Sequence, residues 1–185
     1  MSEPASFYVR VSIDKPQLDA FLQAAPSQPA PNGNWDAWWN SRAMYGATAL
    51  ADELRAWPMA TNGAIVDEWL GDKQSCSFSR YDEENRVWEF GIIMCTDNYA
   101  EILPLLVFCQ SLQPYRNASA QGDVGIVYPF FWGDDGVMAY FTYGRDGFEL
   151  APQVGSTGDV PEETMTRLAT RLEAMWNALE ADGAD

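Results

Sequence analysis

Two pairs of strand-like segments, each joined by a short polar turn, place the strongest constraint on the fold of this chain. The first pair is 76–81 and 86–94 around the turn 82–85, and the second is 123–131 and 137–143 around the turn 132–136. The segments are rich in aromatic and β-branched residues, which favour strands. Strands joined by so short a connection run antiparallel, because parallel neighbours need a crossover of a dozen or more residues. The sequence therefore excludes a parallel doubly wound sheet.

Further strands and a long final helix complete the pattern. Residues 7–13 alternate apolar and polar side chains, and residues 148–150 follow the tight turn 144–147. The final helix carries one apolar stripe, with Glu163, Arg167 and Arg171 on its outer side. The stripe consists of Met165, Leu168, Leu172, Met175, Trp176 and Leu179. We expect a single α+β domain over residues 1–185, with an ordered core of about 6–181, in which helices cover a mainly antiparallel sheet of about five to six strands.

Shorter helices are expected between the strands. Residues 50–57 have helical spacing up to Pro58, and a capping-box pair at Asn98 and Glu101 opens a helix to about Leu112. Pro104 lies inside that helix and should kink or restart it.

A third helix contains three tryptophans. Trp35, Trp38 and Trp39 stand at i, i+3 and i+4, the spacing of one helical face. Aromatic side chains at this spacing are more often part of a core than of a ligand site. The alternative is that these rings stack against sugars.

The absence of histidine removes many kinds of active site. Histidine is the commonest general acid–base and zinc ligand, and none of the three cysteines has a histidine to deprotonate it. Neither a glycine-rich dinucleotide loop nor a Walker lysine motif occurs, and the only lysines are Lys15 and Lys73. Carboxylate pairs could act in a glycosidase, but no spacing singles one out among 27 acidic residues. We expect no enzymatic activity, no cofactor and no metal.

The hairpin turns concentrate exposed acidic side chains. Ordinary turn chemistry and solubility explain any one of them, since Asp and Gly suit tight turns. The alternative interpretation is a surface that binds a basic partner, with an aromatic anchor and a charged rim. The residues that we predict for this surface are Asp82, Glu83, Glu84, Trp132, Asp134, Asp135 and Asp146. A calcium site at 133–136 is a weaker alternative, because the alternating ligands and distal Glu of an EF-hand loop are missing.

The net charge restricts the partners. With 27 acidic and 11 basic residues the formal charge is −16, whereas nucleic acid and anionic lipid attract basic proteins. We therefore expect no nucleic acid and no membrane as partner. No apolar run approaches the roughly 20 residues of a membrane-spanning helix. Cys76, Cys95 and Cys109 lie without close spacing in apolar segments, which indicates reduced thiols and a cytoplasmic location.

These features together resemble the bacterial immunity proteins of polymorphic and type VI secretion toxin systems. The residues that carry the resemblance are the acidic turn 82–84, the strand 86–91, the turn 132–136 and the amphipathic final helix. The resemblance implies a small cytoplasmic α+β protein that binds and neutralises one cognate toxin by occluding it. A nuclease toxin would suit the charge, since a nuclease presents a basic groove to phosphates.

Two other functions stay open at this point. One is a small carbohydrate-active enzyme or sugar-binding domain that uses the tryptophans and a carboxylate pair. The other is a secretion chaperone or adaptor, which would bind a partner without inhibiting it.

Overall fold

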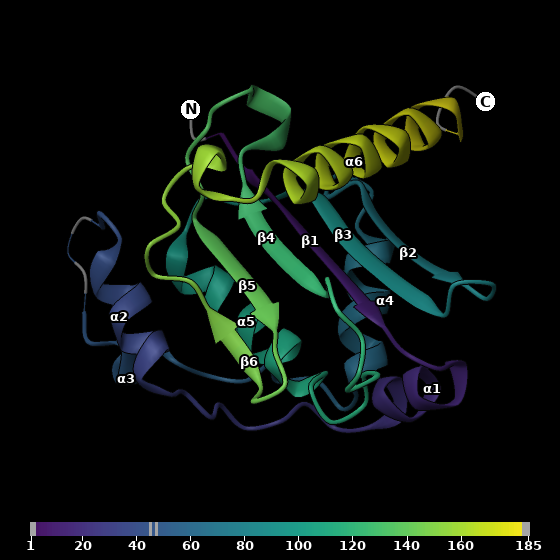
Figure 1. Ribbon diagram of the computed structural model, residues 1–185, viewed down its shortest axis with the longest axis horizontal. Coiled ribbons are helices and arrows are strands. Elements are labelled where there is room, and N and C mark those ends of the chain that lie inside the picture. The colour runs from purple at the N-terminus through teal and green to yellow at the C-terminus, as the bar shows by residue number, and fades with distance from the viewer. Residues whose placement is uncertain (1–2, 45, 47, 183–185) are drawn as a thin grey trace.

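A six-stranded antiparallel sheet forms the centre of the fold, with the strands in the order β2-β3-β1-β4-β5-β6 (Figure 1). The computed structural model describes residues 3–44, 46 and 48–182, so the other residues of the predicted domain lie outside the described part. The N-terminal strand occupies the middle of the sheet, because β1 pairs with β3 on one side and with β4 on the other. The strands are β1 (Ala5–Ser12), β2 (Ser77–Asp82), β3 (Val87–Thr96), β4 (Val124–Tyr128), β5 (Ala139–Tyr143) and β6 (Phe148–Leu150).

The helices cover the two faces of the sheet unequally. In Figure 1, α4 and α5 lie behind the sheet, α1 and α2 lie along its rim, and α6 crosses the front. We call the face behind the strands, which α4 and α5 cover, the helix-covered face, and we call the front face the α6 face. This arrangement confirms the predicted α+β fold with a long C-terminal helix. The α-helices are α1 (Lys15–Gln23), α2 (Gly33–Ser41), α3 (Leu50–Glu53), α4 (Asn62–Gly71), α5 (Tyr99–Ser111) and α6 (Glu162–Asp182), and two 3-10 turns are η1 (Phe130–Trp132) and η2 (Thr157–Asp159).

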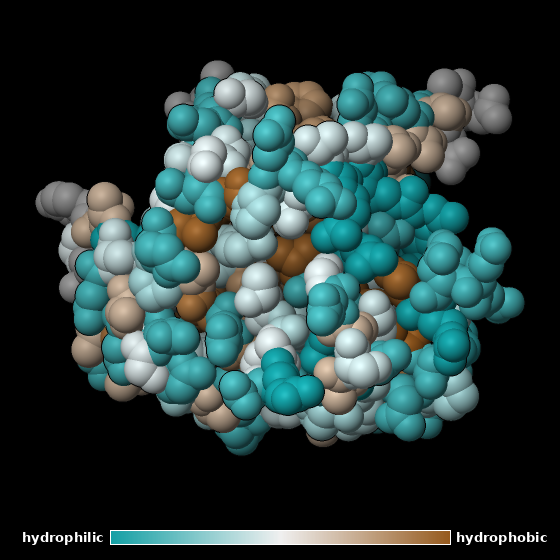
Figure 2. All heavy atoms as spheres, viewed as in Figure 1, coloured by the Kyte–Doolittle hydropathy of each residue, from teal (hydrophilic) through white to brown (hydrophobic). Residues whose placement is uncertain are grey.

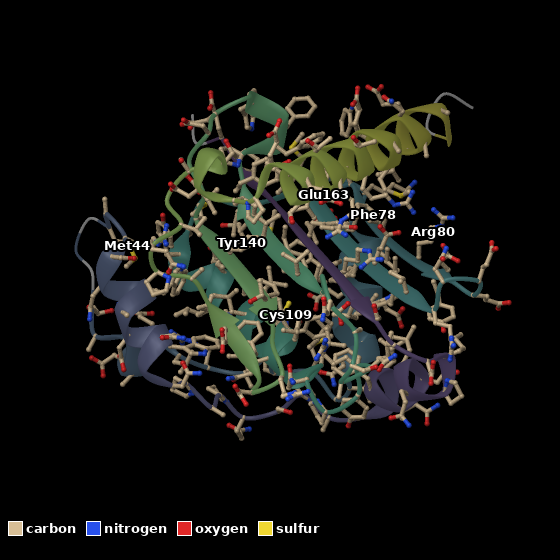
Figure 3. The ribbon with its side chains drawn as sticks, in the orientation of Figure 1. Met44, Phe78, Arg80, Cys109, Tyr140 and Glu163 are labelled. Carbon is tan, nitrogen blue, oxygen red and sulfur yellow. The ribbon has the colours of Figure 1, made fainter. Side chains whose placement is uncertain are left out.

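An aromatic core fills the helix-covered face. Trp88 and Phe90 project from β3 with parallel rings 5.8 Å apart, and Phe108 of α5 packs edge-on against both. Phe21 of α1 joins them with a centroid 5.3 Å from that of Phe108. Figure 3 shows Cys109 of the same helix behind the strands. Burial of several large rings supplies most of the hydrophobic stabilisation of the domain.

The α6 face is packed by a single helix. Leu168 and Leu172 of α6 are fully buried against a cluster that includes Tyr8 and Ile126. The predicted position of Arg171 on the outer side is wrong, because its Nε and Nη2 donate to the Glu89 carboxylate of β3 at 2.6–2.9 Å. Glu89 points to the α6 face, and a buried carboxylate without a cationic partner would be costly. No helix among the described residues is long and apolar enough to cross a membrane.

Two glycines allow close packing of aromatic rings on opposite faces. The ring of Phe78 covers Gly91 of the adjacent strand, where an added Cβ would lie 2.4 Å from Phe78 Cζ. On the helix-covered face Phe141 covers Gly125 in the same way, and an added Cβ there would lie 2.1 Å from Phe141 Cζ. Any larger residue at either glycine would displace a buried ring.

A buried ion pair fixes the connection between α5 and β4. Arg116 Nε donates to Asp123 Oδ2 at 2.8 Å, and both side chains are fully buried. The other oxygen of Asp123 accepts from the backbone N–H and the hydroxyl of Ser12 at 2.8 Å each. The Arg116 guanidinium also lies 5.4 Å from the ring centroid of Tyr143. This network joins the end of β1 to the loop before β4.

Two local predictions are corrected, and one of the two alternatives for Pro104 is excluded. The helix expected to reach Pro58 ends at Glu53: the backbone of Leu54 is already extended, and Trp57 packs against Trp69. The helix that contains Pro104 does not restart there: α5 runs continuously from Tyr99, and only the hydrogen bond to the first turn is lost. Glu101 accepts from the hydroxyl of Thr96 rather than from the backbone of Asn98.

Candidate protein-binding surface

The loop between β4 and β5 is held in one conformation by its own turns and by the segment before α6. Gly133 has φ 73°, a left-handed conformation that favours glycine, and it ends η1. Asp134 Oδ1 accepts from the N–H of Gly136 at 2.9 Å. The backbone N–H of Thr157 donates to the carbonyl of Asp135 at 2.7 Å. The side chains of this loop are therefore presented on a fixed backbone.

Three aromatic side chains form a cluster at the outer end of this loop. Phe131 and Trp132 are 41% and 46% exposed, which makes them two of the three large apolar side chains that stand out from the described surface. Their ring centroids lie 5.2 Å apart, and Phe131 packs edge-on against Trp176 of α6 at 4.9 Å. We call Phe131, Trp132 and Trp176 the aromatic cluster. Adjacent exposed rings of this kind are typical of protein interfaces.

Two carboxylates stand beside the aromatic cluster. Asp134 and Asp135 follow Trp132 by two and three residues, and both are exposed. Among the described residues, the side chain of Asp135 makes no hydrogen bond, and that of Asp134 accepts only the Gly136 N–H. Both carboxylates are thus available to a basic partner. Three of the predicted residues, Trp132, Asp134 and Asp135, therefore lie on this one loop.

The first hairpin turn holds its acidic residues at another corner of the molecule. Asp82 accepts from the side chain and backbone of Asn85 and from the backbone of Glu84, and these hydrogen bonds hold the pKa of Asp82 below its usual value. Glu83 and Glu84 are exposed at the tip. Asp82 therefore has the local turn role that ordinary turn chemistry predicts.

The sheet topology separates the predicted acidic turns. The β2–β3 turn and the β5–β6 turn, which carries Asp146, lie on opposite edges of the six strands. Four strand spacings of about 4.8 Å place them roughly 19 Å apart. The β4–β5 loop lies at the other end of β5 from the turn that carries Asp146 (Figure 1). The seven predicted residues therefore do not form one continuous surface.

Two members of the aromatic cluster were missing from the sequence prediction. Trp176 was assigned to the apolar stripe of the final helix, which is correct but incomplete, since its ring also contacts Phe131. The run Phe130-Phe131-Trp132 at the end of the predicted strand 123–131 was the available signal, because three consecutive aromatic side chains cannot all point into one core.

The tryptophans of α2 belong to the core. Trp35 and Trp38 are fully buried and Trp39 is 4% exposed, which confirms the core interpretation. The indole N–H of Trp38 donates to the carbonyl of Met138 at 3.0 Å, and that of Trp39 to the carbonyl of Thr48 at 2.8 Å. These rings are therefore almost entirely closed to a sugar, and only the edge of Trp39 reaches a surface pocket. Within the described ranges no group of three His, Cys, Asp or Glu side chains could hold a metal ion, so the geometry does not support the calcium alternative.

Comparison with family models, with curated proteins and with solved structures found no match to this chain.

Proposed function

We propose that this protein is a non-catalytic immunity protein that binds a basic antibacterial toxin and thereby neutralises it. The observation that supports the proposal is the aromatic cluster, which is exposed on a fixed loop and flanked by Asp134 and Asp135. Exposed aromatic side chains with a charged rim are the usual composition of an interface hot spot. The buried tryptophans of α2 disfavour the sugar-binding alternative.

The charge favours a nuclease as the toxin. A nuclease must present a basic groove to phosphates, and a protein of formal charge −16 is attracted to such a groove and repelled by nucleic acid itself. Long-range attraction raises the association rate, while the aromatic anchor, which the partner would bury, lowers the dissociation rate. The proposed inhibition is steric and electrostatic occlusion in the cytoplasm of the producing cell, without chemistry on the toxin.

The test begins with capture of the partner and continues with one substitution. The tagged protein is used to isolate bound proteins from its source bacterium at low and high salt, and the partner is identified by mass spectrometry. The Trp132→Ala substitution should then weaken binding by about 2 kcal/mol or more, which is roughly 30-fold in Kd. Leu70→Ala is the matched control, because Leu70 is 43% exposed on α4 and lies outside the proposed surface.

A second pair of substitutions separates the aromatic and acidic contributions. Replacing Asp134 and Asp135 with Lys should slow association at low salt and have less effect at high salt, because salt screens exposed charges. Unchanged affinity at low salt would contradict this placement of the surface. A captured partner that stays active when bound would instead identify a chaperone or adaptor.

A further inference from the structure

A cavity of about 340 Å³ lies on the helix-covered side, away from the β4–β5 loop. It opens between the segment that precedes α4, the indole of Trp69 in α4, the end of β3 and the first turns of α5. A volume of a few hundred Å³ is at the lower end of the range for ligand pockets. The residues that line it are Arg55, Trp57, Trp69, Cys95, Thr96, Ala100, Glu101 and Pro104.

Two tryptophans form an angled wall of this cavity. The rings of Trp57 and Trp69 meet at 61° with their centroids 6.2 Å apart, and both side chains are only partly buried. The tryptophans of α2 and Trp88 are, in contrast, almost completely buried. Indole faces attract cations more strongly than other aromatic side chains do.

A carboxylate stands at the same cavity. Glu101 Oε2 accepts from the Thr96 hydroxyl at 2.5 Å, and Oε1 accepts no hydrogen bond from the described residues. The Thr96 oxygen itself accepts from the N–H of Asn98 at 3.1 Å, so this chain of hydrogen bonds fixes the carboxylate at the start of α5. Burial and the nearby Glu101 charge raise the pKa of the Cys95 thiol to about 12. The thiol is therefore a neutral, weakly polar part of the wall.

The arginine at the cavity is already engaged. Nη2 of Arg55 lies 3.1 Å from Glu53 Oε2, and Nε donates to the backbone carbonyl of Glu53 at 3.1 Å. Its charge is thus offset by a neighbouring carboxylate, whereas Glu101 has no cationic partner among the described residues. The cavity therefore combines apolar walls, two indole rings, an arginine that is engaged with Glu53, and the Glu101 carboxylate, which has no ion-pair partner among the described residues.

We propose that this cavity binds an organic cation, an ammonium or guanidinium group on an apolar stem. The stem would contact Ala100, Pro104 and the indoles, and the cationic head would lie beside Glu101. The head could belong to a free amine or to a lysine or arginine side chain of a protein. The site does not depend on the proposed function, because it shares no residue with the aromatic cluster.

The test is a titration that is monitored by the indole N–H signals in a proton–nitrogen NMR spectrum. Hexylammonium chloride is the probe, and 1-hexanol and hexanoate are its neutral and anionic matches. Trp57→Phe and Trp69→Phe assign the two signals of interest. We expect hexylammonium to shift both signals with a Kd on the order of millimolar, as suits a ligand of few atoms. Hexanol should bind roughly three- to fivefold more weakly, because the carboxylate is exposed, and hexanoate should not bind.

The variant Glu101→Gln should reduce the affinity for hexylammonium to that for hexanol, and Gln can still accept the Thr96 hydrogen bond. Glu173→Gln, on the exposed side of α6, is the control and should leave both affinities unchanged. Equal binding of the cation and the alcohol to the unmodified protein, or no shift at either indole, would overturn the proposal.

A peptide arm distinguishes the two sources of the cation. An uncharged pentapeptide with a central lysine is compared with the same peptide that has glutamine at that position. Tighter binding of the lysine peptide than of hexylammonium assigns the cavity to a protein side chain, and weaker binding assigns it to a free amine. Preference for the glutamine peptide over the lysine peptide would contradict the cation site.

Discussion

The two faces of the sheet are stabilised in different ways, and each contains one ion pair that reflects its surroundings. On the helix-covered side the Arg116–Asp123 pair is fully buried and is joined to Ser12 and to the ring of Tyr143. On the α6 face the Arg171–Glu89 pair is partly open, since 25% of the arginine side chain and 8% of the glutamate side chain are exposed. Water can therefore hydrate the charge that a lost partner leaves on the α6 face. It cannot do so for the buried pair on the helix-covered side.

The single helix leaves much of the α6 face to be covered by side chains. Figure 2 shows the α6 face as largely hydrophilic, with apolar residues visible only in small separate patches. Two long side chains of α6 extend over this face: Arg171 reaches Glu89 of β3, and Arg167 reaches the Gly122 carbonyl. The comparison indicates that a single amphipathic helix suffices for a face that is rich in long polar side chains, whereas the aromatic face needs several helices.

The largest expected effect is on the buried pair. The substitution Asp123→Asn leaves the Arg116 charge buried without a counterion and should lower the free energy of unfolding by about 3–5 kcal/mol. Urea unfolding measured by tryptophan fluorescence would determine this value. The double variant with Arg116→Met should regain part of the loss, because it removes the unpaired charge. A loss below about 1 kcal/mol in the single variant would mean that water reaches this side of the sheet.

An intermediate effect is expected on the pair of the α6 face. Glu89→Gln keeps an acceptor for Arg171 and for the Tyr8 hydroxyl but removes the negative charge, and it should cost about 1–2 kcal/mol. The same urea experiment applies, and high salt should reduce the difference between variant and parent. A cost equal to that of Asp123→Asn would remove the distinction between the two faces.

The smallest effect at neutral pH is expected for Tyr8→Phe, which removes the 2.6 Å hydrogen bond to Glu89 and should cost about 1 kcal/mol. Burial, followed by the charge of Glu89 and the hydrogen bond to it, raises the pKa of Tyr8 far above its ordinary value. The folded state therefore keeps the proton that the unfolded state releases, so stability is lost as the pH rises above about 10. The variant should lose less stability than the parent between pH 9 and 11. If parent and variant instead lose stability in parallel as the pH rises, Tyr8 ionises as readily in the folded state as in the unfolded chain.

Much of the fold followed from local sequence patterns. The two hairpins and the apolar stripe of α6 depend on neighbouring residues, and the structure confirms them, although the strand predicted to reach residue 131 ends at Tyr128 and a 3-10 turn follows. The central position of β1 could not be predicted in this way, because its pairing with β3 and β4 joins residues that are about 80 to 120 positions apart. Arg171 was misassigned for the same reason: its partner Glu89 is 82 residues away.

The candidate surface was predictable only in part. Trp132, Asp134 and Asp135 are neighbours in sequence, and the loop keeps them together. Asp82 and Asp146 were grouped with them by charge, but strand order places their turns at other corners. The contact between Phe131 and Trp176 depends on how α6 crosses the sheet, which the sequence does not specify locally.

The position of β1 also has a consequence for biosynthesis. This strand is synthesised before the other five, so both of its partners come later, and the second ends at Tyr128. At about 5–20 residues per second, roughly 4–17 s pass between completion of β1 and completion of β3. During that time the apolar residues of β1 have no strand to pair with. A nascent chain of this topology is therefore expected to need a chaperone at the ribosome more than one whose first strand pairs with its neighbour in sequence.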